Sequence, residues 1–303
     1  YLAALQAVDP DGPVNEPEVR RLADLFTAAL RACRSEGREL SALAPGRFLM
    51  PGDLEGAPAL TFAPLRLGGE GSRPSSLAAL MERRFEAYKS RVVRPFFTEH
   101  FSRIDRQIVL VDVLGALNGG PEAIRDLEEA LADVLLAFRV GSSSLLSSLF
   151  APRVNRILFA ATKADHLHHS NHDKLEAILR MLVRRAYHRA TGAGVPSEAL
   201  ALAAIRATRE VIAREKGQEL PCVAGVPIAG ETLDGQVFDG IGEIAIFPGD
   251  LPENAEAVFK GESVPLRFLR FRPPSPVMRK DAGGLPHIRL DRALEFLIGD
   301  ALA

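Results

Sequence analysis

The sequence predicts an α/β protein whose central part is a parallel β-sheet. Three short apolar runs, at residues 108–111, 157–161 and 199–205, have the length and continuity of strands buried on both faces. Amphipathic segments that fit helices lie between these runs, and this alternation is typical of parallel sheets with right-handed crossovers. Ligands bind such sheets beyond the carboxyl ends of the strands, so functional residues are expected there.

The overall composition is that of an ordinary globular protein. The chain has 303 residues, of which 47% are hydrophobic and 25% charged, and its net charge is −2. A nearly neutral chain generates no field that would favour nucleic acid or an anionic membrane. The two cysteines, Cys33 and Cys222, form no CxxC pair, which argues against a disulfide framework and favours a cytoplasmic protein. No apolar run is long enough to span a bilayer, so direct membrane insertion is not expected.

Residues 1–104 are predicted to form a helical segment with irregular connections. Apolar residues recur at helical spacing from Val19 to Cys33, which indicates a first helix. A second helix is predicted over residues 77–88, with Pro95 limiting its extension because proline disrupts a helix interior.

Residues 105–208 hold the predicted sheet and its helices. Pro121 is expected to open the helix after the first strand, since proline is favoured at the first helical position. Ser170 and Asp173 are expected to cap the helix after the second strand.

Residues 209–303 are rich in turns and predict a small α+β region. The pattern indicates a short strand at residues 244–247 and an edge strand at residues 266–268. A final helix is predicted over residues 291–298, with Gly299 as its end.

Thr162, Lys163, Ala164 and Asp165, here called the TKAD loop, directly follow the second predicted strand. This sequence matches the [NT]KxD motif that recognises the base in P-loop GTPases. Guanine presents two neighbouring donors, N1–H and N2–H, and the carboxylate of Asp165 would accept both, whereas adenine offers no such pair. Each hydrogen bond to a charged group contributes about 1.5–3 kcal/mol. The apolar stem of Lys163 would lie over the base. The alternative is a solvent loop that has this sequence by chance.

A second base contact is expected after the third strand. The segment of residues 204–208, here called the 204–208 loop, contains Ala207 and Thr208. A backbone N–H near Ala207 would donate to guanine O6. Small residues commonly follow strands, however, so an ordinary loop remains the alternative.

The sequence lacks the phosphate-binding motif of a GTPase. No GxxxxGK[ST] pattern occurs, and the glycine-rich residues 68–72 carry no lysine and fit a linker. Asp112, followed by Gly115, would suit a Mg²⁺-binding DxxG, but an aspartate at a strand end is common in α/β sheets. Residues 142–144, three serines, fit a helix cap better than a nucleophile. No catalytic residue can therefore be assigned.

Four histidines, His166, His168, His169 and His172, follow the TKAD loop closely. This spacing would suit a transition metal, but no cysteine or carboxylate constellation completes a site. A polar loop is therefore the preferred interpretation, and no metal site is predicted.

The chain resembles the YcjX-like family of stress-associated P-loop NTPases. The stretches that carry this resemblance are residues 45–52, 105–112, 158–166, 285–291 and 293–300. The resemblance implies a partial Ras-like P-loop NTPase sheet with a helical insertion, and base contacts from Thr162, Lys163 and Asp165. In this family the phosphate-binding loop and the Mg²⁺ ligands precede the segment that begins here, which fits the missing motif and the absence of a starting Met. This also makes Asp112 a poor candidate for a Mg²⁺ ligand.

The resemblance leads to a GTP- and GDP-binding protein, with Mg²⁺ held by residues upstream of this chain. The chain would supply the guanine-recognition half of a GTPase and is not expected to be active alone. The alternatives are a nucleotide-gated scaffold with little turnover and an ATP-using NTPase. The family's link with stress response, and its frequent gene neighbour encoding a membrane protein, imply a possible membrane-protein partner.

Overall fold

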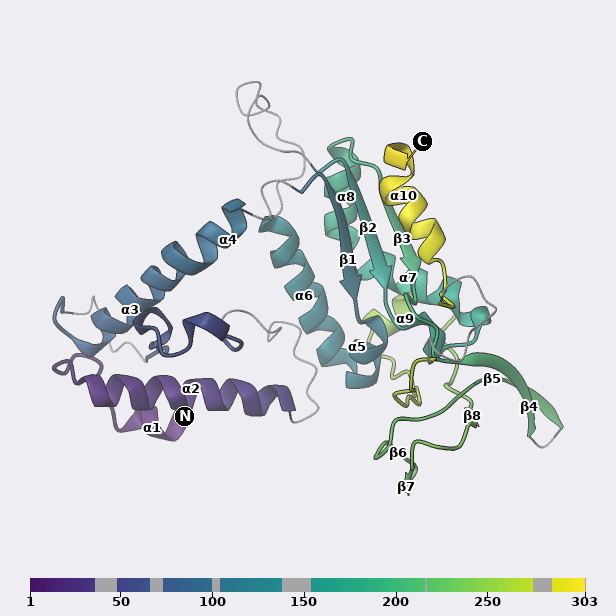
Figure 1. The fold of residues 1–303 in the computed structure, drawn as a ribbon, viewed down its shortest axis with the longest axis horizontal. Coiled ribbons are helices and arrows are strands. Elements are labelled where there is room, and N and C mark those ends of the chain that lie inside the picture. The colour runs from purple at the N-terminus through teal and green to yellow at the C-terminus, as the bar shows by residue number, and fades with distance from the viewer. Residues whose placement is uncertain are drawn as a thin grey trace. The chain divides into compact units, whose positions relative to one another are not determined.

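The structure is a computed structural model that describes residues 1–35, 48–65, 73–99, 104–137, 154–215, 217–274 and 285–302. The chain divides into two compact units, Tyr1–Ile104 and Asp105–Ala303 (Figure 1). The predicted division into three parts, with a boundary after residue 208, stays a prediction. The expected linker at residues 68–72 and the expected cap at residues 142–144 lie outside the described residues.

The first unit is helical, as the sequence predicts. Its helices are α1 (Leu2–Gln6), α2 (Glu16–Ser35), α3 (Leu77–Tyr88) and α4 (Arg94–Glu99), with a π-helical turn at Lys89–Val93 and 3₁₀ turns at Gly52–Leu54 and Pro58–Leu60. The core of this unit includes Leu22, Phe62 and Met81. Pro95 does not end the helical run as expected, because it lies in the first turn of α4, where proline is tolerated, directly after the π-helical turn.

The second unit is built on a three-stranded parallel sheet, which confirms the α/β prediction. The strands β1 (Arg106–Val111), β2 (Arg156–Ala161) and β3 (Ser197–Ala201) are hydrogen-bonded in that order. Val111, Ala161 and Ala201 lie side by side at the carboxyl edge. β3 ends four residues earlier than predicted, so residues 202–205 belong to the connection that follows it.

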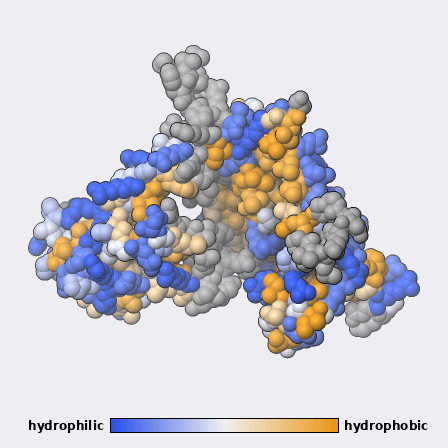
Figure 2. All heavy atoms as spheres, viewed as in Figure 1, coloured by the Kyte–Doolittle hydropathy of each residue, from blue (hydrophilic) through white to orange (hydrophobic). Residues whose placement is uncertain are grey.

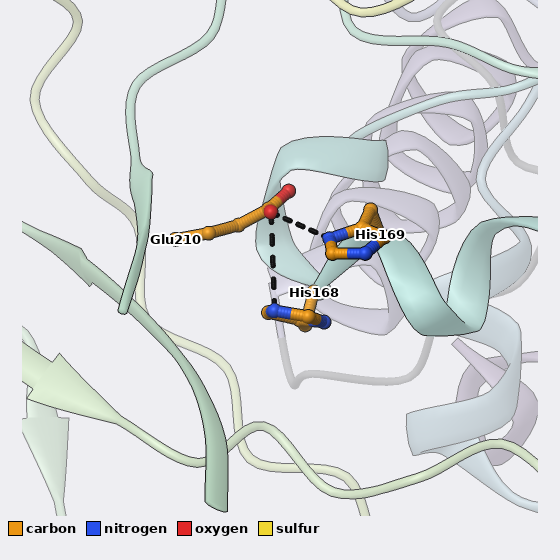
Figure 3. Close-up of side chains that lie close together, drawn as sticks. All are labelled: His168, His169 and Glu210. Atoms are coloured by element: carbon orange, nitrogen blue, oxygen red, sulfur yellow. Dashed lines mark hydrogen bonds and ion pairs between the residues drawn. The ribbon is translucent and has the colours of Figure 1, made fainter. Parts of the chain in front are cut away.

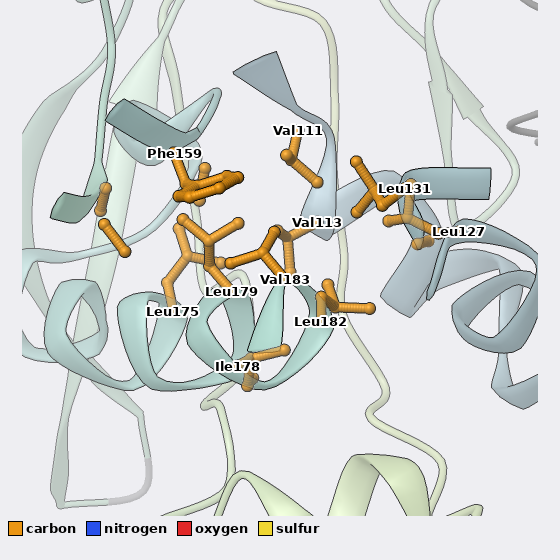
Figure 4. Packing of buried hydrophobic residues seen from close by; sticks show 14 of the residues in the cluster. Val111, Val113, Leu127, Leu131, Phe159, Leu175, Ile178, Leu179, Leu182 and Val183 are labelled. Atoms are coloured by element: carbon orange, nitrogen blue, oxygen red, sulfur yellow. The ribbon is translucent and has the colours of Figure 1, made fainter. Parts of the chain in front are cut away.

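Helices cover the two faces of this sheet. On one face lie α5 (Val113–Gly119), α6 (Pro121–Ala137), α7 (His172–Leu182) and α8 (Arg184–Gly192). Figure 4 shows Phe159 of β2 facing Leu175 and Leu179 of α7, and all three are fully buried. On the other face α10 (Leu290–Leu302) packs on β2 and β3 through Ala293 and Leu297. Pro121 opens α6, as predicted.

β1 is less covered than its apolar sequence predicts. Ile108 is 41% exposed and Leu110 is 60% exposed, whereas their neighbours on β2, Leu158 and Ala160, are fully buried. The reason is that α10 packs on β2 and β3 but leaves these β1 side chains open. Figure 2 shows apolar residues gathered over this part of the sheet and along α10.

The helix after the TKAD loop does not have the predicted cap. Asn171, rather than Ser170 or Asp173, occupies the N-cap position of α7, and its side chain makes no capping hydrogen bond. Its amide is used elsewhere: Nδ2 donates to Asp250 Oδ1 at 3.0 Å and Oδ1 accepts from the Leu251 N–H at 2.9 Å. Asn171 therefore ties the start of α7 to a distant loop.

The rest of the second unit is antiparallel. The strands β4 (Arg209–Glu215), β5 (Gln218–Gly225) and β8 (Ile244–Ile246) form one sheet, β6 (Thr232–Leu233) and β7 (Gln236–Val237) form a hairpin, and α9 (Glu256–Phe259) follows. β8 confirms the predicted strand, but residues 266–268 form none.

α10 continues past Gly299, contrary to the prediction. Its last turn is tied to β1, because Arg106 donates to the Leu297 carbonyl at 2.5 Å and forms an ion pair with Asp300. Among the described residues, no helix has the length and apolarity that crossing a membrane requires.

Candidate functional site

The TKAD loop lies at the carboxyl end of β2 and is fixed to the end of β1 and to the residue that follows β3. The Thr162 N–H donates to the Val111 carbonyl at 2.9 Å, and the Thr162 hydroxyl donates to the same oxygen at 3.3 Å. On the other side the Ala164 N–H donates to the Leu202 carbonyl at 3.2 Å. The hydroxyl thus anchors the loop to the end of β1, and the loop is held at the ligand-binding edge of the sheet.

Asp165 lies against the 204–208 loop. The Ala207 N–H donates to Asp165 Oδ2 at 2.9 Å, and the Thr208 hydroxyl donates to the Asp165 backbone carbonyl. Asp165 is 5% exposed and Thr208 is 7% exposed. The structure thus brings together Asp165, Ala207 and Thr208, the residues that the sequence singled out on two separate loops.

Lys163 has a backbone conformation that is uncommon for a residue with a side chain. Its φ is +61°, in the left-handed region, and its ammonium group forms an ion pair with the Asp112 carboxylate. Asp112 also accepts from the Gly115 N–H at 3.1 Å and so caps α5. Asp112, the aspartate of the DxxG sequence, serves as a helix cap and as the partner of Lys163.

A cleft of about 920 Å³ opens beside the 204–208 loop. Ala207 and Thr208 line it, together with Arg206, Arg209 and Arg272. Arg209 is paired with Glu243 at 2.8 Å across this cleft. Glu210 is paired with Arg206 at 3.2 Å in the same lining, so three arginines against two glutamates leave an excess of one positive charge, which suits an anionic ligand.

Two more N–H groups precede Ala207 in the same loop. In the part of the chain that the structure describes, the N–H groups of Ala204 and Ile205 have no hydrogen-bond partner, and both residues are exposed. Sequence reasoning singled out Ala207, whose N–H is already bonded to Asp165, and passed over these two. A residue type cannot reveal which backbone N–H is free, because that depends on the path of the loop.

Three of the histidines after the TKAD loop have lowered pKa values. Burial lowers the pKa of His166, His168 and His172, because a buried imidazole is more costly to charge. His172 donates from Nε2 to the Ala164 carbonyl at 3.0 Å, and so supports the TKAD loop from below. These histidines are therefore neutral rings at neutral pH.

A carboxylate that the sequence did not indicate lies beside two of these histidines. Glu210, at the start of β4, lies against His168 and His169 (Figure 3). Burial raises the pKa of Glu210, but the hydrogen bond to His169 and the nearby charges of His169 and Arg206 outweigh it, and the pKa is lowered overall. Glu210 lies 41 residues after His169, so no local spacing in the sequence could have indicated it.

Comparisons with known proteins agree on one family. The model of the YcjX-like family, DUF463, matches residues 1–302. The chain is 36% identical over 304 residues to the Ras-like GTPase YcjX of Escherichia coli (strain K12), covering 98% of this chain and 62% of that protein. It is 32% identical over 311 residues to the Ras-like GTPase YcjX of Shewanella oneidensis, covering all of this chain and 61% of that protein. The chain thus spans about three fifths of the length of these relatives.

Proposed function

This chain belongs to the YcjX-like family, and we propose that it is the guanine-recognition part of a GTPase, with the TKAD loop and the 204–208 loop as its base site. The names of its relatives support a guanine nucleotide as the ligand. The single observation that carries the proposal is the hydrogen bond between Asp165 and the Ala207 N–H of the 204–208 loop, at the carboxyl edge of the sheet.

Guanine would bind by exchanging one hydrogen-bonded pair for another. Asp165 Oδ2 now accepts from the Ala207 N–H. A guanine base between the two loops would offer N1–H and N2–H to the carboxylate and its O6 oxygen to the loop. The N–H of Ala207 would then donate to O6, and the N–H groups of Ala204 and Ile205 would add to this contact. Both protein groups stay hydrogen-bonded in the free and the bound state, so the buried carboxylate is never left unpaired.

The backbone of Lys163 supports a functional role for the TKAD loop. Non-glycine residues in sparsely populated backbone regions cost about 1–3 kcal/mol and gather at ligand sites. The left-handed φ of Lys163 places its exposed side chain at the mouth of the loop, beside Asp112. If Lys163 leaves Asp112 when a base binds, the four-carbon stem of Lys163 would cover the face of the base.

The phosphate half of the site would come from the rest of the protein. The strand order is β1, β2, β3, so β1 has a free edge within the described residues, and its Ile108 and Leu110 are exposed. An added strand and helix at this edge would cover them. The relatives are longer than this chain by about two fifths of their length, which is enough for such elements. Phosphate binding, Mg²⁺ binding, hydrolysis, a stress-related role and a membrane-protein partner are all parts of this proposal for the whole protein.

The test is nucleotide selectivity in an Asp165→Asn variant of the full-length protein. An amide accepts from N1–H and donates to the O2 carbonyl of xanthine, so the variant should lose GDP affinity and gain XDP affinity. Loss of one hydrogen bond to a charged group corresponds to about a tenfold to hundredfold weaker Kd. Displacement of a fluorescent guanine nucleotide by GDP, XDP and ADP measures this.

Asp291→Asn is the matched control for this test. Asp291 is an exposed aspartate in the first turn of α10, and its substitution should leave all three affinities unchanged. A GDP affinity that stays at the wild-type level in Asp165→Asn would overturn the proposed base site.

A further inference from the structure

Two imidazoles and one carboxylate converge beside the base site. His169 Nδ1 lies 2.7 Å from Glu210 Oε2, and His168 Nε2 lies 3.8 Å from the same oxygen. The two imidazole rings lie next to each other with their centroids 4.2 Å apart. In Figure 3 both rings direct a nitrogen toward the Glu210 carboxylate. An ordinary surface ion pair would use one histidine, so the convergence of two on one oxygen calls for another explanation.

We propose that His168 Nε2, His169 Nδ1 and Glu210 Oε2 form a binding site for Zn²⁺. These three atoms all lie within 4.8 Å of one another. In a tetrahedral zinc site with bonds of about 2.05 Å, neighbouring ligand atoms are about 3.3 Å apart. The two measured distances to Oε2 lie on either side of this value. Small side-chain rotations would therefore bring the three atoms to zinc distance, and two histidines with one glutamate leave a fourth position for water.

The surroundings of His168 suit a metal ligand. His168 is 8% exposed, and its Nδ1 lies 2.9 Å from the Ser170 hydroxyl. With zinc on Nε2, the proton moves to Nδ1 and is donated to Ser170 Oγ, which fixes the tautomer and the ring orientation. The weaker contact from the Ser170 N–H to Nδ1, at 3.4 Å, would be lost in that tautomer.

Of the two carboxylate oxygens of Glu210, Oε1 contacts an arginine and Oε2 is available to a metal. Arg206 contacts Glu210 Oε1 at 3.2 Å, and Oε2 is the oxygen that faces the histidines. The guanidinium group disfavours a cation, whereas Asp250, which is near enough to act on His168, favours one. One carboxylate and two imidazole nitrogens suit Zn²⁺ better than Mg²⁺ or Ca²⁺, which select oxygen ligands.

Zinc at this position would join the two segments that form the proposed base site. His168 follows Asp165 by three residues, and Glu210 follows Thr208 by two. Metal binding would hold the 204–208 loop and the start of β4 against the segment that follows the TKAD loop. The zinc site itself rests on side-chain geometry alone and does not depend on guanine binding.

The experiment is a zinc titration of the full-length protein without nucleotide. We expect one Zn²⁺ per chain by isothermal titration calorimetry, and Co²⁺ in its place should give visible absorption bands of a four- or five-coordinate site. His169→Ala and Glu210→Gln should each weaken binding at least tenfold. His169 is an exposed side chain, so its substitution leaves the fold intact.

The controls are His188→Ala and Glu219→Gln, which change the same residue types at exposed positions of α8 and β5. Both should bind zinc as the wild type does. The proposal is overturned if the wild type binds no zinc, or if His169→Ala and Glu210→Gln bind it with wild-type affinity.

Discussion

Replacement of Asn171 by alanine should destabilise the second unit by about 1.5–4.5 kcal/mol. Asn171 is 1% exposed, and its amide makes two hydrogen bonds that span about 80 residues of sequence. Loss of the acceptor leaves the N–H of Leu251 unpaired in a buried position, which costs about 1–3 kcal/mol. Loss of the donor to Asp250 costs less, about 0.5–1.5 kcal/mol, because Asp250 is exposed and regains water.

Asn254→Ala is the matched control for this prediction. Asn254 also accepts a backbone N–H, that of Glu256 at 2.9 Å, but it does so in an exposed position where water replaces the bond. Its loss should cost less than about 1 kcal/mol. Urea denaturation followed by circular dichroism gives both values, and hydrogen exchange of residues 156–182 reports whether the second unit is affected. Equal losses in the two variants would refute the reasoning from burial.

Two further predictions concern the core and the histidines of the second unit. Leu179→Ala removes a fully buried side chain of α7 and should lower the free energy of unfolding by about 2–5 kcal/mol. Its control, Leu294→Ala on the exposed side of α10, should lower it by less than about 1 kcal/mol in the same denaturation assay. Similar losses in the two variants would contradict the burial of Leu179. Burial lowers the pKa of His172, so the unfolded chain takes up a proton first as pH falls below about 6.5. The free energy of unfolding should therefore be highest above this pH and decline below it. His172→Gln should reduce that decline by at most about 1.4 kcal/mol per pH unit. A pH profile of stability that is unchanged in this variant would contradict the prediction.

The parallel sheet could be predicted because its strands are continuous apolar runs. Such a run identifies a strand, but it does not say what covers each face. Ile108 and Leu110 have the residue types of a buried strand, yet they are exposed because the apolar side chains of α10 pack on those of β2 and β3. The strands β4 and β5 were not predicted individually, because their mixed polar and apolar residues lack a clear alternation.

The position of the TKAD loop could also be predicted, because a motif after a buried strand must lie at the edge of the sheet. The contacts of that loop could not. Asn171 would be read from sequence as a helix cap, since asparagine favours that position, but its amide is taken by residues 250 and 251. Glu210 joins the histidines only because β4 begins directly after the 204–208 loop. Both contacts depend on the three-dimensional path of segments that are distant in sequence.

The hydrogen bond between Asp165 and Ala207 has a consequence for selectivity. In the free protein Asp165 Oδ2 accepts from the Ala207 N–H, and in the proposed exchange a base enters between these two groups and breaks this bond. Guanine replaces it with two donors for Asp165 and an acceptor for the loop. Adenine would instead place an acceptor, its N1, against the carboxylate, and would leave a nearly buried charge without a partner. The self-paired resting state thus weakens the binding of every base by the same amount, and only guanine recovers the loss. Discrimination between GDP and ADP should therefore come from the cost of leaving Asp165 unpaired, more than from the strength of the guanine contacts themselves.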